Sequence, residues 1–279
     1  MTFGEILNEA TTYLERGNIS DAKTDAWQLM EFVWGINRSY YFAHSDDIIE
    51  AEKKEQYMTL IHRRSEHIPV QLLTNQAHFM GHTFYVNGDV LIPRLDTEIL
   101  VEEVSKVVQR GDKILDLCTG SGCIIISLLL DNQEKDLQGV AIDVSAGAIA
   151  VAKVNAKLLD VDVEFIESNL FEKSEDKYNV IVSNPPYIRT AVIQELMPEV
   201  REHEPLLALD GSDDGLYFYR KIVAQAADFL TEEGWLAFEV GYDQGMDVSE
   251  MMTSSGYIDV KVIKDLAGLD RVVIGQRGN

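Results

Sequence analysis

The second half of the chain alternates short apolar runs with longer helical stretches, and this alternation limits the possible folds more than any other feature. Beyond residue 110 the apolar runs lie at 113–117, 137–142, 163–166, 180–183 and 235–240, with helical patterns between them at 123–130, 146–159 and 215–230. Strands that alternate with helices form βαβ units, because the helix carries the chain back to start a parallel strand. The pattern therefore predicts an α/β fold built on a mostly parallel sheet.

Two further β-rich runs follow, at 257–263 and 271–275. The link between them, 265–270, is too short to hold a crossover helix, so we expect these two strands to pair antiparallel. With the earlier runs they predict a seven-stranded sheet that is mostly parallel and whose last strand is antiparallel.

The first third of the chain has a helical pattern instead. Thr2 and Glu5 form a capping-box signature ahead of an apolar face that continues to Gly17. Further helical patterns cover 22–33 and 46–67, and alternating apolar residues from His78 onward indicate a short hairpin. We expect a small helical domain at 1–76, a hairpin-like connector at 77–110 and an α/β domain at 111–279.

The charge of the chain bears on its partners. It has 47 acidic and 24 basic residues, which gives a formal net charge of −23. Proteins that grip nucleic acid neutralise its phosphates with Lys and Arg, so this balance argues against direct binding of nucleic acid. A basic protein partner is the easier interpretation.

Several other classes of protein are excluded. The longest apolar run, 123–130, ends at Asp131, well short of the roughly 20 residues that span a bilayer. The N-terminus shows no secretory signal, and Cys118 and Cys123 have neither disulfide-framework nor zinc-ligand spacing. The six His residues are scattered without metal-ligand spacing. We expect a reduced, cytoplasmic protein that contacts no membrane and binds no metal.

A glycine-rich loop follows the first strand of the α/β domain and leads into a helix. It contains Asp116, Cys118, Thr119, Gly120, Ser121 and Gly122. Glycines let backbone approach a ligand closely, and the first turn of a helix offers free N–H groups. Asp143 ends the next strand, where a carboxylate can accept hydrogen bonds from ribose hydroxyls; the alternative is that it caps the following helix. This context favours a nucleotide-type site.

The loop pattern narrows the choice of ligand. Asp-x-Cys-x-Gly-x-Gly lacks the Gly-x-Gly-x-x-Gly of dinucleotide sites and the Lys of a phosphate-binding P-loop. S-adenosylmethionine remains, because it has no phosphate and its cationic sulfonium suits an acidic surrounding such as Asp116. A turn residue that hydrogen-bonds the backbone is the other interpretation of Asp116.

The segment Asn184-Pro185-Pro186-Tyr187 follows the fourth strand, at the sheet edge where open α/β folds bind ligands. A rigid turn explains the prolines but requires neither Asn184 nor Tyr187. A planar amide or amino nitrogen is a poor nucleophile, since its lone pair is delocalised. Two acceptors aimed at its N–H bonds, the Asn184 side-chain oxygen and the Pro185 carbonyl, can turn that lone pair toward a methyl donor. Tyr187 can stack on the flat substrate group.

The Asn-Pro-Pro-Tyr segment resembles that of amino-methyltransferases that act on adenine, guanine or glutamine nitrogen. Four further segments extend the resemblance to the HemK/PrmC family, the release factor glutamine methyltransferases: 92–98, 116–123, 204–211 and 265–271. The resemblance covers nearly the whole chain. The chain departs from the family pattern at Cys118, where Gly is usual, and at Leu95, where Pro is usual.

The resemblance implies a Rossmann-like S-adenosylmethionine-dependent methyltransferase whose N-terminal helical domain engages the substrate. The substrate would be the glutamine of the Gly-Gly-Gln motif in peptide chain release factors, methylated on its side-chain nitrogen, with S-adenosylhomocysteine as the second product. Residues 184–187 would hold this glutamine, 118–122 with Asp143 would hold the cofactor together with Asn184, and Asn169 and Leu170 would flank the adenine. We expect a monomer. The alternatives are an enzyme that methylates adenine or guanine in nucleic acid and a non-catalytic cofactor-binding protein.

Overall fold

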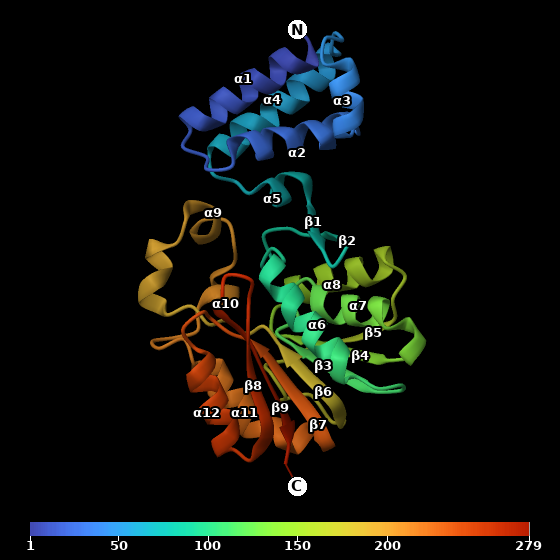
Figure 1. Cartoon of the computed structure of the whole chain (residues 1–279), viewed down its shortest axis with the longest axis vertical. Coiled ribbons are helices and arrows are strands. Elements are labelled where there is room, and N and C mark those ends of the chain that lie inside the picture. Colours follow the sequence, from blue (N-terminus) through green and yellow to red (C-terminus); the bar gives the residue numbers. More distant parts are fainter. Residues whose placement is uncertain (279) are drawn as a thin grey trace. The chain divides into compact units, whose positions relative to one another are not determined.

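The computed structural model describes residues 1–278, and its contacts divide the chain into two compact units (Figure 1). The helical unit contains residues 1–76 and 197–203, and the α/β unit contains residues 77–196 and the chain from 204 onward. The predicted helical domain was 1–76 alone, whereas in the structure the chain returns to the helical unit once more, through 197–203.

Short loops join five helices of the helical unit, α1 (Phe3–Arg16), α2 (Ala22–Trp34), α3 (Arg38–His44), α4 (Ala51–Ser65) and α5 (Val70–Thr74). The unit also contains α9 (Pro198–Arg201), which lies much later in the chain. The capping box is present, since Thr2 Oγ1 accepts from the Glu5 N–H at 3.3 Å and Glu5 Oε2 accepts from the Thr2 N–H at 2.9 Å. The helix predicted at 46–67 begins only at residue 51, and α3 and α5 were not predicted.

A buried ion cluster fixes the 197–203 segment to the rest of the helical unit. Arg64, which is 6% exposed, donates from Nε to Asp25 Oδ2 at 2.7 Å and from Nη2 to Glu199 Oε1 at 3.1 Å. His67 Nδ1 lies 2.9 Å from the same oxygen of Glu199. Burial raises the pKa of Asp25 even though Arg64 opposes this shift. The cluster joins three stretches of chain that are far apart in the sequence.

The α/β unit begins with the expected hairpin. Strands β1 (Gln76–Phe79) and β2 (His82–Tyr85) pair in a two-stranded sheet, and both residues between them have positive φ, as in a two-residue hairpin turn. The short helix η1 (Leu95–Thr97) and helix α6 (Glu98–Val107) follow. Helix α6 was not predicted, although Leu100, Val101 and Val104 lie on one helical face and are buried against the main sheet.

The main sheet confirms the predicted fold class. Its strands are β3 (Lys113–Leu117), β4 (Gln138–Asp143), β5 (Val163–Glu167), β6 (Tyr178–Ser183), β7 (Leu230–Glu239), β8 (Tyr257–Lys264) and β9 (Asp270–Arg277), in the spatial order β5-β4-β3-β6-β7-β9-β8. Neighbours from β5 to β7 are parallel, and β9 is antiparallel to both β7 and β8. Sequence analysis did not predict that β9 lies between β7 and β8.

Helices cover both faces of the sheet (Figure 1). Helices α6, α7 (Cys123–Asp131) and α8 (Ala146–Leu158) pack on one face, where Ile114, Val180 and Val182 point. Helices α11 (Tyr217–Phe229) and α12 (Gly245–Ser254) pack on the other face with Leu115 and Ile181. Three short helices complete the unit, η2 (Gln133–Lys135), η3 (Thr190–Glu195) and α10 (Leu206–Leu209). The near-continuous apolar strands follow from burial on both faces.

The strand order determines where a ligand-binding crevice can form. The chain leaves β3 toward β4 on one side and later returns to β6 on the other side of β3. Loops that leave the carboxyl ends of strands separate at such a point and open a crevice between them. The loops after β3, β4, β5 and β6 therefore meet at one edge of the sheet. Within residues 1–278 no helix is both long and apolar enough to span a membrane.

Candidate active site

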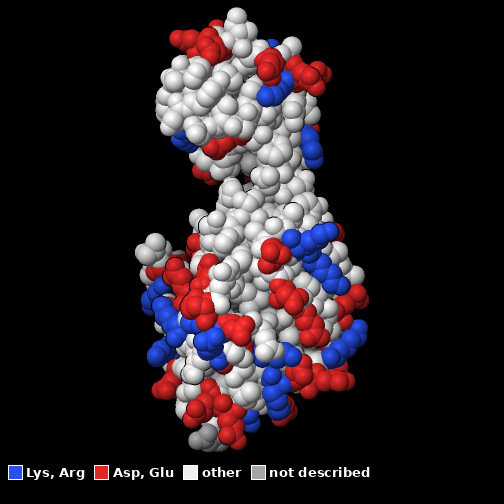
Figure 2. Space-filling model, turned by 90° about the vertical axis from the view of Figure 1, so that its right-hand side faces the viewer, with Lys and Arg blue, Asp and Glu red and all other residues white. Residues whose placement is uncertain are grey.

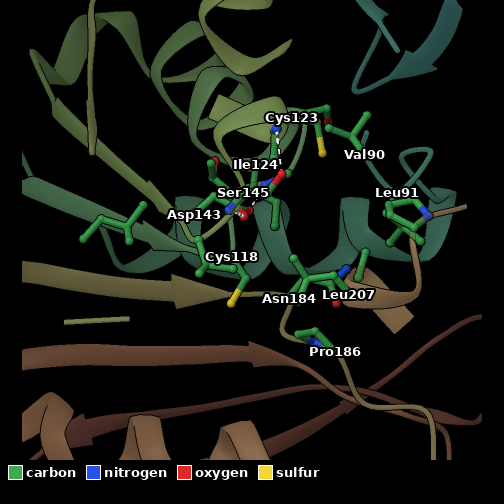
Figure 3. Close-up of a pocket in the computed structure, with 18 of the residues that line it drawn as sticks. Val90, Leu91, Cys118, Cys123, Ile124, Asp143, Ser145, Asn184, Pro186 and Leu207 are labelled. Carbon is green, nitrogen blue, oxygen red and sulfur yellow. Dashed lines mark hydrogen bonds between the residues drawn. The ribbon is translucent and has the colours of Figure 1, made fainter. Parts of the chain in front are cut away.

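A cavity opens at the carboxyl edge of the main sheet (Figure 3). It contains about 990 Å³ of space between protein atoms, counting its open mouth. The sequence-predicted residues that line it are Cys118, Thr119, Gly120, Ser121, Asp143, Asn169, Leu170, Asn184 and Pro186. The fold thus brings together residues from the loops after β3, β4, β5 and β6, as the strand order requires.

Four predicted residues lie beside the cavity without lining it: Asp116, Gly122, Pro185 and Tyr187. Asp116 is fully buried, and its Oδ2 accepts from Thr119 Oγ1 at 2.6 Å, so it fixes the loop from behind. Burial raises the pKa of Asp116 to about 7. Gly122 is the N-cap of α7 and has φ of 78°, and a β-carbon there would lie 3.2 Å from that of Ala152. Its role is close packing between α7 and α8.

Asp143 joins the glycine-rich loop to the start of α8. Its Oδ2 accepts from the Gly120 N–H and its Oδ1 from the Ser145 N–H, both at 2.9 Å. Ser145 is the N-cap of α8, since its Oγ accepts from the Ala148 N–H at 3.2 Å, so the N-cap interpretation of Asp143 is wrong. A carboxylate has about four lone-pair sites, so Asp143 can still accept from a donor in the cavity. Burial raises the pKa of Asp143, and the backbone N–H groups oppose that shift.

Cys118 adopts the left-handed conformation, with φ of 60°. Glycine reaches this conformation without strain, whereas a side chain such as that of Cys118 adopts it at a cost of roughly 1–2 kcal/mol. The side chain of Cys118 is half-buried and lies on the wall of the cavity, so it occupies space that a glycine would leave open.

The loop after β6 is held by its backbone. The Tyr187 carbonyl accepts from Gln244 Nε2 at 3.0 Å, and Ile188 exchanges hydrogen bonds with Leu209 and Gly211 at 3.0 and 2.8 Å. No donor among residues 1–278 reaches the carbonyl of Pro185 or the side-chain oxygen of Asn184. The loop therefore presents two acceptor oxygens without protein partners, one of them on a side chain that lines the cavity.

A buried carboxylate lies behind this loop. Glu239, which is 1% exposed, accepts from Thr97 Oγ1 at 2.5 Å and from the Tyr187 hydroxyl at 3.2 Å. Burial raises the pKa of both Tyr187 and Glu239. The Tyr187 hydroxyl is thus engaged with the protein.

The structure adds residues that sequence reasoning did not assign to the site. The connector lines the cavity through Asp89, Val90, Leu91, Pro93, Arg94 and Thr97, the 205–208 segment through Pro205, Leu207 and Ala208, and α11 through Phe218. Two of the segments that carry the family resemblance, 92–98 and 204–211, contribute to this lining. The sequence therefore marked both segments, although it assigned them no role in the site.

The charged side chains of the 92–98 segment are held in ion pairs and hydrogen bonds. Arg94 Nη2 lies 2.6 and 2.7 Å from the two carboxylate oxygens of Glu204, whose side chain is buried. Asp96 pairs with Arg271 at 3.2 Å, and Glu98 Oε1 accepts from the Met80 N–H at 2.6 Å. These contacts fasten residues 92–98 to the rest of the α/β unit beside the cavity.

The surface carries no single basic stripe on the face that Figure 2 shows. Lys and Arg side chains stand there in separate small groups beside Asp and Glu. Among residues 1–278, no three His, Cys, Asp or Glu side chains are grouped so that they could hold a metal ion.

Comparison with known proteins decides the family. Residues 5–74 match the family model of the PrmC N-terminal domain, and residues 94–203 match that of the methyltransferase small domain. A release factor glutamine methyltransferase from Clostridium acetobutylicum is 35% identical over 285 residues, which cover 100% of this chain and 99% of the relative. This chain belongs to the release factor glutamine methyltransferase family.

Other relatives agree with that assignment. A release factor glutamine methyltransferase from Geobacter sulfurreducens is 38% identical over 278 residues, with 99% of this chain and 97% of the relative covered. A methyltransferase structure from Pyrococcus furiosus superimposes with a TM-score of 0.53 at 16% identity, over 81% of this chain and 100% of that one. The structural likeness supports the fold alone. The similarity to the sequence relatives shows that this chain is a methyltransferase enzyme.

Proposed function

We propose that this enzyme transfers a methyl group from S-adenosylmethionine to the side-chain nitrogen of the glutamine in the Gly-Gly-Gln motif of peptide chain release factors. The observation that carries the proposal is the pair of unpartnered acceptors on the loop after β6, the Asn184 side-chain oxygen and the Pro185 carbonyl. They lie beside a cavity that Asp143 also lines. The names of the relatives support the choice of release factors as substrates.

The residues of the cavity fit this cofactor. A β-carbon at Gly120 would meet nothing within 4 Å, so the backbone of the loop is open to a ligand at this point. The remaining acceptor capacity of Asp143 suits a ribose hydroxyl, and Leu170 beside Asn169 offers an apolar surface to a flat base. When bound, S-adenosylmethionine supplies an electrophilic methyl group on a cationic sulfonium. Asp116, fixed behind the loop by Thr119, adds negative charge near that cation when it is ionised.

The loop after β6 would orient the glutamine. Its amide N–H bonds donate to Asn184 Oδ1 and to the Pro185 carbonyl, which turns the nitrogen lone pair toward the methyl group. Both acceptors strengthen their hydrogen bonds as positive charge develops on that nitrogen, so they favour the transition state over the ground state. Pro186 stiffens the loop, and Tyr187 borders the glutamine while its hydroxyl stays tied to Glu239. Catalysis is then mainly positioning.

The helical unit would engage the release factor. The transfer chemistry needs none of residues 1–76, and the match of residues 5–74 to the PrmC N-terminal domain supports a role that the family shares. We propose 1–76 as the substrate-recognition domain, 77–110 as the connector and 111–279 as the methyltransferase domain. Because the net charge of the chain is −23, we propose that the enzyme acts on a protein and does not bind nucleic acid directly. We also propose that it acts as a monomer. A cytoplasmic location would follow from the proposed substrate.

Transfer of a labelled methyl group tests the proposal. Purified enzyme is incubated with labelled S-adenosylmethionine and, in separate reactions, a release factor, the same factor with the target glutamine replaced by alanine, RNA and DNA. We expect label in the unaltered release factor alone. Label in RNA or DNA but not in the release factor would support an adenine or guanine methyltransferase instead.

A further inference from the structure

Three side chains from separate segments form a hydrogen-bonded chain that ends at the loop after β6. Thr97 Oγ1 lies 2.5 Å from Glu239 Oε2 and 3.4 Å from Asn184 Nδ2. Thr97 is 2% exposed and Glu239 is 1% exposed. Thr97 belongs to the 92–98 segment of the family resemblance, to which the proposed chemistry assigns no role.

Counting donors fixes the direction of this chain. A threonine hydroxyl has one proton, and a carboxylate can only accept, so Thr97 donates to Glu239. Thr97 Oγ1 then faces Asn184 with lone pairs alone. The end of the Asn184 amide that can donate to it is the nitrogen, which leaves Oδ1 directed away from Thr97.

Other contacts hold Glu239 in place as an acceptor. Its second oxygen accepts from the Tyr187 hydroxyl at 3.2 Å, and the positive charge of Arg271 favours its ionised form. Arg271 itself is fixed between Asp96 and Asp265, with contacts of 3.2 Å to each. Burial acts in the opposite direction and raises the pKa of Glu239, so the surrounding donors are needed to keep it an acceptor.

We propose that Thr97 and Glu239 are positioning residues that turn the oxygen of the Asn184 amide toward the substrate and thereby make the site select an N–H donor over a carboxylate. This inference rests on the proposed function. The reversed amide would present an N–H group to the substrate, and that group suits a glutamate side chain rather than a glutamine. Without the Thr97 hydroxyl, little distinguishes the two orientations of the amide.

The test compares Thr97→Val, which keeps the shape of the side chain, with Thr97→Ser, which keeps its hydroxyl. For each variant and for the unaltered enzyme we would measure kcat and KM on a release factor and the Kd of S-adenosylmethionine. A fourth measurement is the inhibition constant of a release factor that carries glutamate at the target position. Thermal unfolding shows whether each variant is folded.

We expect Thr97→Val to lower kcat by roughly 10-fold or more, the effect of about 1.4 kcal/mol in the transition state. The glutamate-bearing release factor should bind it better than it binds the unaltered enzyme, by about the same factor. Cofactor affinity should stay within about twofold, since an effect below 0.5 kcal/mol is typical away from the altered contact. Thr97→Ser should recover most of the lost kcat and the lost discrimination.

Glu239→Gln gives an independent test, and it replaces Thr97→Val if that variant does not fold. Its amide can donate to Thr97, which frees the Thr97 hydroxyl to donate to Asn184 Oδ1 and so favours the reversed amide. The same fall in kcat and the same gain in binding of the glutamate-bearing factor are expected. The inference would be overturned if the unaltered enzyme is active and the folded variants keep both its kcat and its preference for glutamine over glutamate. An unaltered enzyme that does not methylate the release factor would instead contradict the proposed function.

Discussion

Gly215 lies directly against the loop after β6, since a β-carbon at this position would stand 2.4 Å from the carbonyl oxygen of Tyr187. Gly211 makes a similar contact, with 2.7 Å from its hypothetical β-carbon to the Tyr187 Cα atom. The Gly215 backbone also has φ of 75°. Glycine at these two positions lets two stretches of backbone touch, and this contact supports the loop that holds Asn184.

Gly215→Ala should therefore displace the loop. Real β-carbons essentially never approach an atom so closely, so the Tyr187 carbonyl must move and kcat on a release factor should fall by at least about tenfold, equivalent to about 1.4 kcal/mol. Gly256→Ala is the matched control, because Gly256 has φ of 89° but open space around its Cα hydrogens. Both variants carry the left-handed strain of roughly 1–2 kcal/mol. Equal kcat values for the two variants would show that the contact does not matter.

Asp143→Asn tests the cofactor site. The variant keeps the shape of the side chain but turns one acceptor oxygen into a donor, which faces either the Gly120 or the Ser145 N–H group. We expect S-adenosylmethionine to bind more weakly by roughly 1–3 kcal/mol, measured by calorimetry. Asp160→Asn is the control, since Asp160 is exposed in the same unit. The same affinity in both variants would contradict the ribose-binding role of Asp143.

The buried carboxyl of Asp116 should make stability depend on pH. Burial raises its pKa from 3.8 to about 7, so between those values the folded protein binds a proton that the unfolded chain has released. Its contribution to the free energy of unfolding therefore falls as pH rises through this window and is level above it. Asp116→Asn does not titrate. The free energy of unfolding of the variant minus that of the unaltered protein, from urea titrations, should rise across the window; a flat difference would contradict the raised pKa.

Arg64→Ala should destabilise the helical unit. The substitution leaves Asp25 buried without its cation and removes the bond to Glu199 in the 197–203 segment. Breaking a buried pair by removing one partner costs about 3–5 kcal/mol. Arg63→Ala, at an exposed position on the same helix, should change stability by less than about 0.5 kcal/mol. Denaturant unfolding measures both, and a similar loss in the two variants would show that the buried cluster is not what holds the unit together.

Local patterns predicted much of this fold because the relevant forces act over short stretches of chain. The capping box at Thr2 and the apolar strands of the sheet depend on neighbours within a few residues. The face of α6 formed by Leu100, Val101 and Val104 was also visible as a helical spacing, although it was not used. The place of Asp143 beside the glycine-rich loop followed from the order of parallel strands.

Contacts between distant segments could not be predicted in this way. Arg94 and Glu204 are 110 residues apart, and Thr97 and Glu239 are 142 apart, so no local pattern reveals that each carboxylate is buried against its partner. The position of β9 between β7 and β8 is a similar case, because the short link requires only that β8 and β9 pair. The ion pairs of the 92–98 segment are long-range contacts of the same kind.

The central claim is that Asn184 and Pro185 direct methyl transfer to a glutamine side-chain nitrogen. The most direct measurement is tandem mass spectrometry of a release factor after reaction with the enzyme, with RNA present in the same tube as a competing acceptor. The account predicts one methyl group on the side-chain nitrogen of the Gly-Gly-Gln glutamine and none after reaction with Asn184→Ala. A methyl group on another residue or on a base of the RNA, or full activity of Asn184→Ala, would contradict it.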